Sequence, residues 1–342
     1  PIRMKNVLFS LVLISFFFTI NNCSTDFDLY ADYKVVPIVY CIADISDDTT
    51  WIKITKAFYG PGNVRLMAQN PDSSNYPYKL DASLTGKKDG VTLEPLILDT
   101  LTIHNKVITD TIINNDGDTI VLNPFYSPEQ LVYYAVGKLD KDAEYTLAIN
   151  KNDGVTILAT TGLVDDFYIT KPDRRIVFTQ TSYGSIKWLS ARNGARYFFS
   201  IKFNYSEYAT GYNDTLKKSV DWFHQTLNAK TDEGEETIEV SYYGADFYTL
   251  LESNIPDILN VERWAENVEI TIACGSRVLI TYIDINAGNA TILEEVPIYS
   301  NIEGGAGIFA SRHTIVTPIQ LSVSTERNLI EDYNLGFKFK QK

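Results

Sequence analysis

Alternation of apolar and polar residues with a period of two recurs along most of this chain, and it is the strongest constraint on the fold. In YFFSIKFNY (197–205), the odd-numbered residues from 199 to 205 are apolar or aromatic, and the even-numbered ones between them are polar. The stretches TWIKITKAF, EYTLAIN and ETIEVSY alternate in the same way. Such alternation is typical of half-buried antiparallel strands. We therefore predict an all-β fold built from β-sandwiches.

A polar stretch, DDFYITKPDRR, divides these strands into two groups. About 320 residues outside a leader are long for one sandwich and sufficient for two. We predict an immunoglobulin-like or transthyretin-like sandwich at 34–165, a linker at 166–175 and a fibronectin type III-like β domain at 176–342. In the second domain, Trp188 occupies the place of a core tryptophan.

Helical patterns are scarce. YYGADFYTLLESNIP carries apolar residues at helical spacing and stops at Pro256. STERNLIEDYN predicts a second short helix, with Ser324 as its N-cap. The second domain is thus expected to be a β domain with one or two short helices.

The chain opens with a short hydrophobic segment after Met4. Residues 7–20 are apolar apart from three hydroxyl residues, which is too short for a membrane span of about 20 residues but typical of a secretory signal. The segment ends in Ile-Asn-Asn-Cys, which resembles a bacterial lipobox. We predict a signal peptide at 1–22, lipid attachment at Cys23 and a lipidated tether at 23–33; the alternative is a free cysteine after a plain signal.

The charge balance is strongly acidic, with a formal net charge of −13. Removal of residues 1–22 lowers the 30 basic residues to 28 against 43 acidic ones, giving −15. Nucleic-acid binders need a cationic face, so we predict no nucleic-acid partner.

Cys41 and Cys274 lie in apolar alternations of different predicted domains, which favours buried free thiols over a disulfide.

No motif in the sequence predicts catalysis, a metal or a cofactor. His104, His224 and His313 are far apart and share no ligand spacing. The glycines of NIEGGAGIF precede strand-like sequence and not the helix that a phosphate loop requires, so we interpret them as sites of positive φ or close backbone packing. Asp44, Asp47 and Asp48 in ADISDD and residues 114–118 (NNDGD) are interpreted as hairpin tips, with calcium binding as the alternative.

Aromatic residues offer the best candidates for ligand contact. Most of the 22 Tyr and 4 Trp residues fall where sandwich cores require aromatic side chains. Trp51, Trp222 and Trp264 are less clearly inward, and Trp51 shares its strand face with lysines. We name these three as candidate ligand contacts, with core or domain-interface packing as the alternative.

Three stretches resemble a family of Bacteroidota lipoproteins known as domain of unknown function 4249: VVPIVYCIADI, KLDKDAEYTLAI and, most specifically, IYSNIEGGAGIFAS. The acidic STDFD after Cys23 also resembles the export tag of surface lipoproteins in this phylum. The resemblance implies a lipid-anchored outer-membrane protein that is exposed at the cell surface and, in that family, often encoded beside a TonB-dependent receptor. It implies no catalytic residues.

These observations favour a non-enzymatic surface lipoprotein that binds a partner or a small-molecule or glycan ligand as an accessory to an outer-membrane receptor. Two rival hypotheses remain. One is a cell-surface hydrolase of glycan or peptide with a carboxylate or metal site that sequence does not reveal. The other is a structural component of a surface machine.

Overall fold

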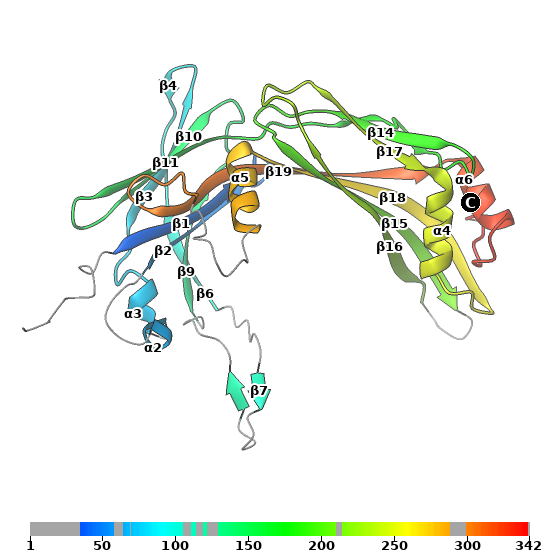
Figure 1. The fold of residues 1–342 in the computed structure, drawn as a ribbon, viewed down its shortest axis with the longest axis horizontal. Coiled ribbons are helices and arrows are strands. Elements are labelled where there is room, and N and C mark those ends of the chain that lie inside the picture. The colour runs from blue at the N-terminus through cyan, green and yellow to red at the C-terminus, as the bar shows by residue number, and fades with distance from the viewer. Residues whose placement is uncertain are drawn as a thin grey trace, which may run out of the picture.

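The computed structural model describes residues 35–57, 64–68, 70–104, 111–113, 119–121, 129–209, 214–287 and 299–340 (Figure 1). The predicted signal peptide, Cys23 and the whole tether at 23–33 lie outside these ranges, as do residues 114–118. The described chain consists mostly of strands with a few short helices, so the all-β prediction is confirmed.

The first sandwich packs two sheets around a core of aliphatic residues and tyrosines. Its first layer contains β1 (Val36–Ala43), β2 (Thr49–Ala57), β9 (Gln130–Val136) and β6 (Asp99–Ile103). Its second contains β11 (Thr156–Gly162), β10 (Glu144–Asn150), β3 (Asp81–Lys88), β4 (Val91–Thr92) and β5 (Leu96–Ile97). Three smaller features accompany them: α2 (Val64–Ala68), α3 (Pro71–Ser74) and the hairpin of β7 (Thr111–Ile113) and β8 (Thr119–Val121).

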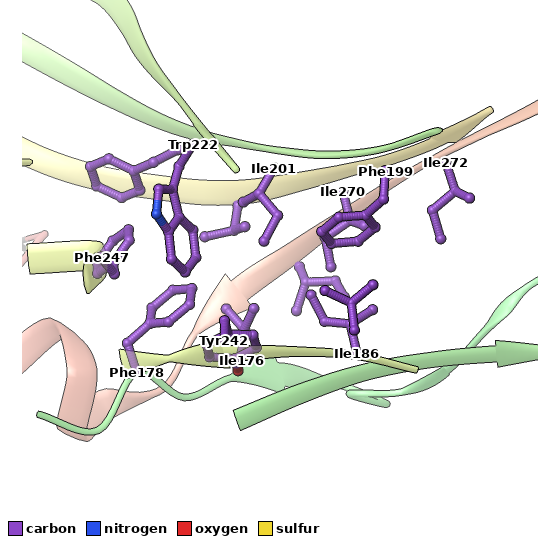
Figure 2. Close-up of a cluster of buried hydrophobic side chains, with 14 of the residues drawn as sticks. Ile176, Phe178, Ile186, Phe199, Ile201, Trp222, Tyr242, Phe247, Ile270 and Ile272 are labelled. Carbon is purple, nitrogen blue, oxygen red and sulfur yellow. The ribbon is translucent and has the colours of Figure 1, made fainter. Parts of the chain in front are cut away.

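The second sandwich sets three strands against four, in agreement with the fibronectin type III-like prediction. The three are β12 (Ile169–Lys171), β14 (Tyr183–Leu189) and β17 (Thr237–Tyr243). The four are β16 (Leu216–Asn228), β15 (Arg196–Ala209), β18 (Val261–Gly275) and β19 (Ala306–Leu321). Aromatic and isoleucine side chains fill the space between the layers (Figure 2), and Trp188 is fully buried there, as expected.

Three helices of about ten residues accompany the second group of strands. The predicted helices are α4 (Gly244–Asn254) and α6 (Val323–Glu331); α6 is capped by Ser322, whose side chain accepts from Thr325 N, and not by Ser324. α5 (Arg277–Ala287) was not predicted. It packs through Leu279 on Ile308 and Ala310 of β19, so it covers the outer face of the sheet near β1.

One strand, β19, belongs to both sandwiches. Its first half pairs in parallel with β1, and its second half pairs antiparallel with β18, so one sheet runs through the whole molecule (Figure 1). Residues 302 and 309, which the sequence placed in the second domain, lie in the first core. The two sandwiches therefore share one sheet, and the linker is not their only connection.

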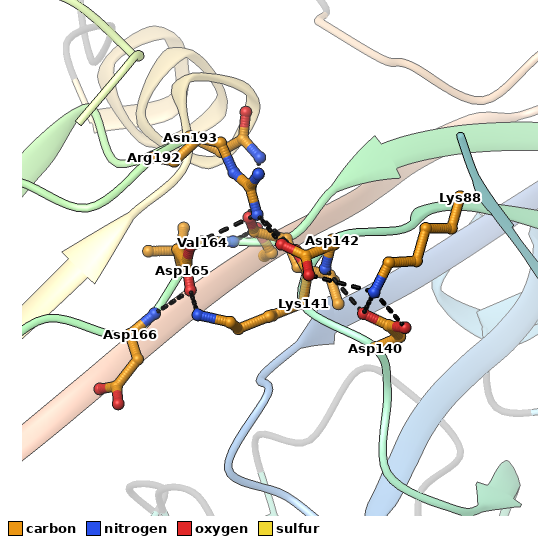
Figure 3. Close-up of polar contacts among 11 residues, drawn as sticks. Lys88, Asp140, Lys141, Asp142, Val164, Asp165, Asp166, Arg192 and Asn193 are labelled. Carbon is orange, nitrogen blue, oxygen red and sulfur yellow. Dashed lines mark hydrogen bonds and ion pairs between the residues drawn. The ribbon is translucent and has the colours of Figure 1, made fainter. Parts of the chain in front are cut away.

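The segment between the sandwiches is tied to both of them. The predicted linker 166–175 contains β12, paired with β14, and the start of β13 (Arg175–Ile176), which pairs with β19. Arg192 contacts Asp142 (2.7 Å) and Asp165 (3.3 Å), and Lys141 contacts Asp165 (2.8 Å) (Figure 3). The backbone N–H of Asp165 also donates to Arg192 O. Exposed ion pairs contribute little singly, but this network joins loops of both sandwiches.

Cys41 and Cys274, the two cysteines in the described ranges, are free and buried in the cores of different sandwiches. Burial raises the pKa of Cys41 far above its usual range and that of Cys274 to about 12. Neither thiol is therefore present as a reactive thiolate at neutral pH.

The glycine-rich start of β19 is a close-packing device, as the sequence indicated. Gly307 has a φ of +111°, and a Cβ there would lie 2.0 Å from the carbonyl oxygen of Val39 on β1. No side chain can be accommodated at that distance. The absence of a side chain at this position is what allows β1 and β19 to pair.

We expect Gly307→Ala to lower the free energy of unfolding by at least about 2 kcal/mol, because it combines an unfavourable φ with a backbone clash. Gly154→Ala is the matched control: its φ is +81°, but nothing lies within 4 Å of the added Cβ. It should cost only about 1 kcal/mol. Urea denaturation of both variants gives the comparison, and equal losses would contradict the close-packing explanation.

Candidate ligand-binding groove

The candidate site lies at the end of the second sandwich far from the first, where β18 extends beyond its neighbour β19 (Figure 1). β19 pairs with residues 268–275 of β18, so the earlier part of β18 needs another partner. The C-terminal segment supplies it: Arg263 N donates to Gly336 O and Lys338 N donates to Arg263 O, both at 2.8 Å. This places residues 338–340 beside β18.

A buried ion pair fixes this end of the sheet. The Arg263 side chain is fully buried; its Nε lies 2.8 Å from Glu207 Oε2, and its Nη1 donates to Leu335 O. Lys218 binds the other oxygen of Glu207. Burial acts to raise the pKa of Glu207, but the bonds from Lys218 and Arg263 outweigh it and lower the pKa. Removing one partner of such a pair typically costs about 3–5 kcal/mol, so the end is firmly held.

Two adjacent hollows at this end form a groove, here called the tip groove. The first, of about 490 Å³, is lined by Ser206, Thr215, Glu262, Trp264, Lys338, Phe339 and Lys340. The second, of about 430 Å³, is lined by Asn204, Tyr205, Lys217, Lys218, Ser219, Glu266 and Asn267. They adjoin where Lys217, from the second hollow, donates to Ser206 of the first (2.9 Å).

Strand register assembles the groove in two polar rows. Lys217, Ser206 and Trp264 are direct cross-strand neighbours on β16, β15 and β18. Ser219, Asn204 and Asn267 form the next row, in which Asn204 Nδ2 donates to Asn267 Oδ1 (2.9 Å). Between the rows the register of β18 shifts, so that Glu266 opposes no residue of β15. This bulge directs the Glu266 carboxylate into the groove.

Glu266 is the electrostatic centre of the tip groove. It accepts from Lys217 Nζ at 2.7 Å and also contacts Lys340 Nζ and the Ser206 hydroxyl. Burial acts to raise the pKa of Glu266, but these three donors lower it to about 2. Lys338 pairs with Glu262. The carboxylate is therefore ionised at neutral pH and organises lysines from β16 and from the C-terminal segment.

The three candidate tryptophans lie in different settings. Trp264 is half-buried and lines the tip groove. Trp51 is 49 % exposed on the outer face of β2, with its ring centroid 5.4 Å from that of Tyr134, but it lies in the other sandwich. Trp222 is 7 % exposed and packs on Phe178 and Phe247 (Figure 2). The prediction of Trp222 as a ligand contact is therefore corrected: its face of β16 is part of the core.

A second polar cluster, which the sequence did not reveal, lies between the sandwiches. His313 of β19 is buried; its Nδ1 is 2.9 Å from Asp44 Oδ1 and its Nε2 is 3.3 Å from Asp166 Oδ1. Burial acts to lower the pKa of His313, but the two carboxylates raise it overall. Burial acts to raise the pKa of Asp44, but bonds from His313 and Ser46 lower it overall. The cluster ties the end of β1 to β19 and to the inter-domain segment.

We expect His313→Asn to lose most thermal stability relative to the native chain at mildly acidic pH. The raised pKa means that the protonated ring stabilises the folded state fully below about pH 6.5, the ordinary value, and less as pH rises through the raised value. The contribution of Asp44 is present above its usual pKa and is lost as pH falls through its lowered value. Melting curves at pH 6 and pH 9 test this.

The control for this measurement is His104→Asn, since His104 has a side chain that is 70 % exposed. That variant should follow the native chain at both pH values. A deficit of His313→Asn that is the same at pH 6 and pH 9 would show that packing, and not the charged pairs, accounts for the role of His313.

The described residues contain no group of three His, Cys, Asp or Glu side chains placed to hold a metal ion. Within the same ranges, no helix has both the length and the apolar character needed to cross a bilayer.

The carboxylates around the groove whose pKa values are shifted, Glu207 and Glu266, both have lowered values. A general acid needs the opposite shift.

Comparison with known proteins adds no assignment. No family model matches the chain, and no curated protein matches it. Among solved structures, a chain of a cytokine receptor complex is 8 % identical, with 84 % of this chain and 98 % of that chain covered and a TM-score of 0.20. The BSP domain of a biofilm-associated protein is 7 % identical over 84 % and 59 % of the two chains, with a TM-score of 0.16. Neither likeness is close enough to carry an argument.

Proposed function

We propose that this protein is a non-enzymatic binding protein, anchored in the outer membrane through a lipid on Cys23, that acts as an accessory to a TonB-dependent receptor. The tip groove is its ligand site. One observation carries the proposal: a groove made of two hollows, of about 490 and 430 Å³, is lined by Trp264, Phe339, side-chain amides and fixed charges. Such a lining suits recognition.

The shape of the molecule supports this arrangement. β1 begins in the first sandwich, and the ends of β15 and β18 that line the tip groove lie at the opposite end of the second (Figure 1). The shared strand β19 and the ion pairs of Figure 3 hold the two sandwiches together. A lipid on Cys23, close in sequence to β1, would present the groove away from the membrane.

Lipid attachment gives the first test. Cells grown with an alkyne-tagged fatty acid should label the native protein, and Cys23→Ala should abolish the label and release the protein from the membrane fraction. Cys41→Ala is the matched control, because that thiol is buried, and it should keep the label. Equal labelling of the Cys23→Ala variant would refute the anchor.

Association with the receptor is tested on the same cells. The tagged native protein should co-isolate with a TonB-dependent receptor from solubilised outer membranes, and Cys23→Ala should not. Isolation of the native protein without any such receptor would refute the accessory role.

Absence of turnover is the second expectation. Purified protein should not hydrolyse chromogenic glycosides, esters, peptides or phosphates, with or without calcium and zinc, because the groove carboxylate Glu266 and the neighbouring Glu207 are held ionised by their cationic partners. Turnover that disappears in Glu266→Gln or Glu262→Gln would establish the hydrolase alternative instead.

A further inference from the structure

The tip groove combines apolar ring surfaces with a dense set of neutral polar groups. Trp264 is half-buried and Phe339 is 47 % exposed at the first hollow. The Asn204–Asn267 amide pair and the Ser219 hydroxyl line the second. Aromatic faces pack on the C–H faces of sugar rings, and amides and hydroxyls donate to and accept from sugar hydroxyls. This lining fits a saccharide better than a purely apolar ligand.

The groove also carries an excess of positive charge in an acidic chain. Four lysines line the groove, Lys217, Lys218, Lys338 and Lys340, against two carboxylates, Glu262 and Glu266. The excess arises because Glu266 pairs with two of these lysines, Lys217 and Lys340, and because Lys218 pairs with Glu207, which is not part of the lining. The whole chain, by comparison, has a net charge of −13.

The lysines retain capacity to bind an anion. An ammonium group has three donors, and Lys338 directs one to Glu262 while Lys340 directs one to Glu266. Both are more than half exposed, and both line the same hollow as Trp264. A carboxylate or sulfate on a sugar stacked against Trp264 would lie within reach of two ammonium groups, and charge-assisted bonds of this kind are among the stronger ones.

We infer that the tip groove binds a saccharide that carries anionic groups, either the carboxylate of a uronic acid or a sulfate. The inference rests on the proposed function, because it names the ligand class of the groove. Trp264 supplies the stacking surface, Lys338 and Lys340 bind the anionic group, and Asn204 and Asn267 bind the hydroxyls of the neighbouring ring.

Calorimetric titration of the purified full-length protein tests the inference with four probes. These are an oligogalacturonate, a neutral galacto-oligosaccharide of equal length, a sulfated galacto-oligosaccharide that carries no carboxylate and poly-L-glutamate. We expect one of the two acidic saccharides to bind at least tenfold more tightly than the neutral one. Binding should weaken as salt is raised from 50 to 500 mM, because exposed charges are then screened. Which acidic saccharide binds identifies the anionic group.

Matched variants locate the site. Trp264→Ala should abolish detectable binding, whereas Trp51→Ala, which removes an exposed tryptophan of the other sandwich, should leave it unchanged. Lys338→Gln with Lys340→Gln should weaken binding at least fivefold. Lys187→Gln breaks a comparable pair with Glu239 on the opposite sheet and should have no effect. Melting curves confirm that each variant is folded.

Several outcomes would overturn the inference. Equal affinity for the neutral and acidic saccharides would remove the role of charge, and tighter binding of poly-L-glutamate would point to an acidic peptide. Acidic-saccharide binding that survives Trp264→Ala would place the site elsewhere, and silence with every probe would reject the ligand class. None of these results alters receptor co-isolation or lipid labelling, so failure of the inference is distinguishable from failure of the proposed function.

Discussion

The pairing of β19 with two different partners is the interaction on which the rest of the structure depends. Its first half completes the sheet of the first sandwich beside β1, and its second half completes the second sandwich beside β18. Phe309 and Ile319, on the same strand, lie in different cores. Hydrogen bonds that run without interruption through one strand leave little freedom for a hinge, and the inter-domain ion pairs reinforce a geometry that the backbone already imposes.

The same strand explains why the far end of the second sandwich can serve as a site. β19 ends at Leu321, where residues 320 and 321 pair with β13, so it does not cover the earlier part of β18, and the C-terminal segment fills the remaining edge. The pairing of the C-terminal segment with β18 brings Lys338 and Lys340 to the sheet next to Trp264. The local charge of the groove therefore follows from how a sheet edge is completed.

The sequence predicted the strands well because period-two alternation reports directly which face of a strand is buried. The apolar residues of the alternation at 197–205 form the inward face of β15, and Trp188 lies in the core. Pairing between segments far apart in the chain could not be predicted from the sequence. No local pattern links Ile38 to Ala306, and the predicted linker contains paired strands because β14 and β19 have edges that pair with them. The domain limits at 165 and 176 stay a prediction.

For the site, sequence selected Trp264 but could not separate it from Trp222, since both occur in strands with aromatic neighbours and only packing decides which face is inward. The alternation of phenylalanine and lysine in FKFK, close to the end of the sequence, was a signal that one more strand-like segment was present. The bulge at Glu266 and the pairing of Asp44 with His313 arise from register and topology, for which no local pattern exists.

The position of β19 in the chain also sets an order of assembly. β1 leaves the ribosome early, yet the strand with which it pairs in parallel lies about 270 residues later. Until that strand arrives, the first sandwich has an open edge beside β1 and lacks the buried rings and aliphatic groups of residues 302 and 309. The domain that is made first is therefore finished last. A chain of this design needs protection of that edge from aggregation for nearly its whole synthesis.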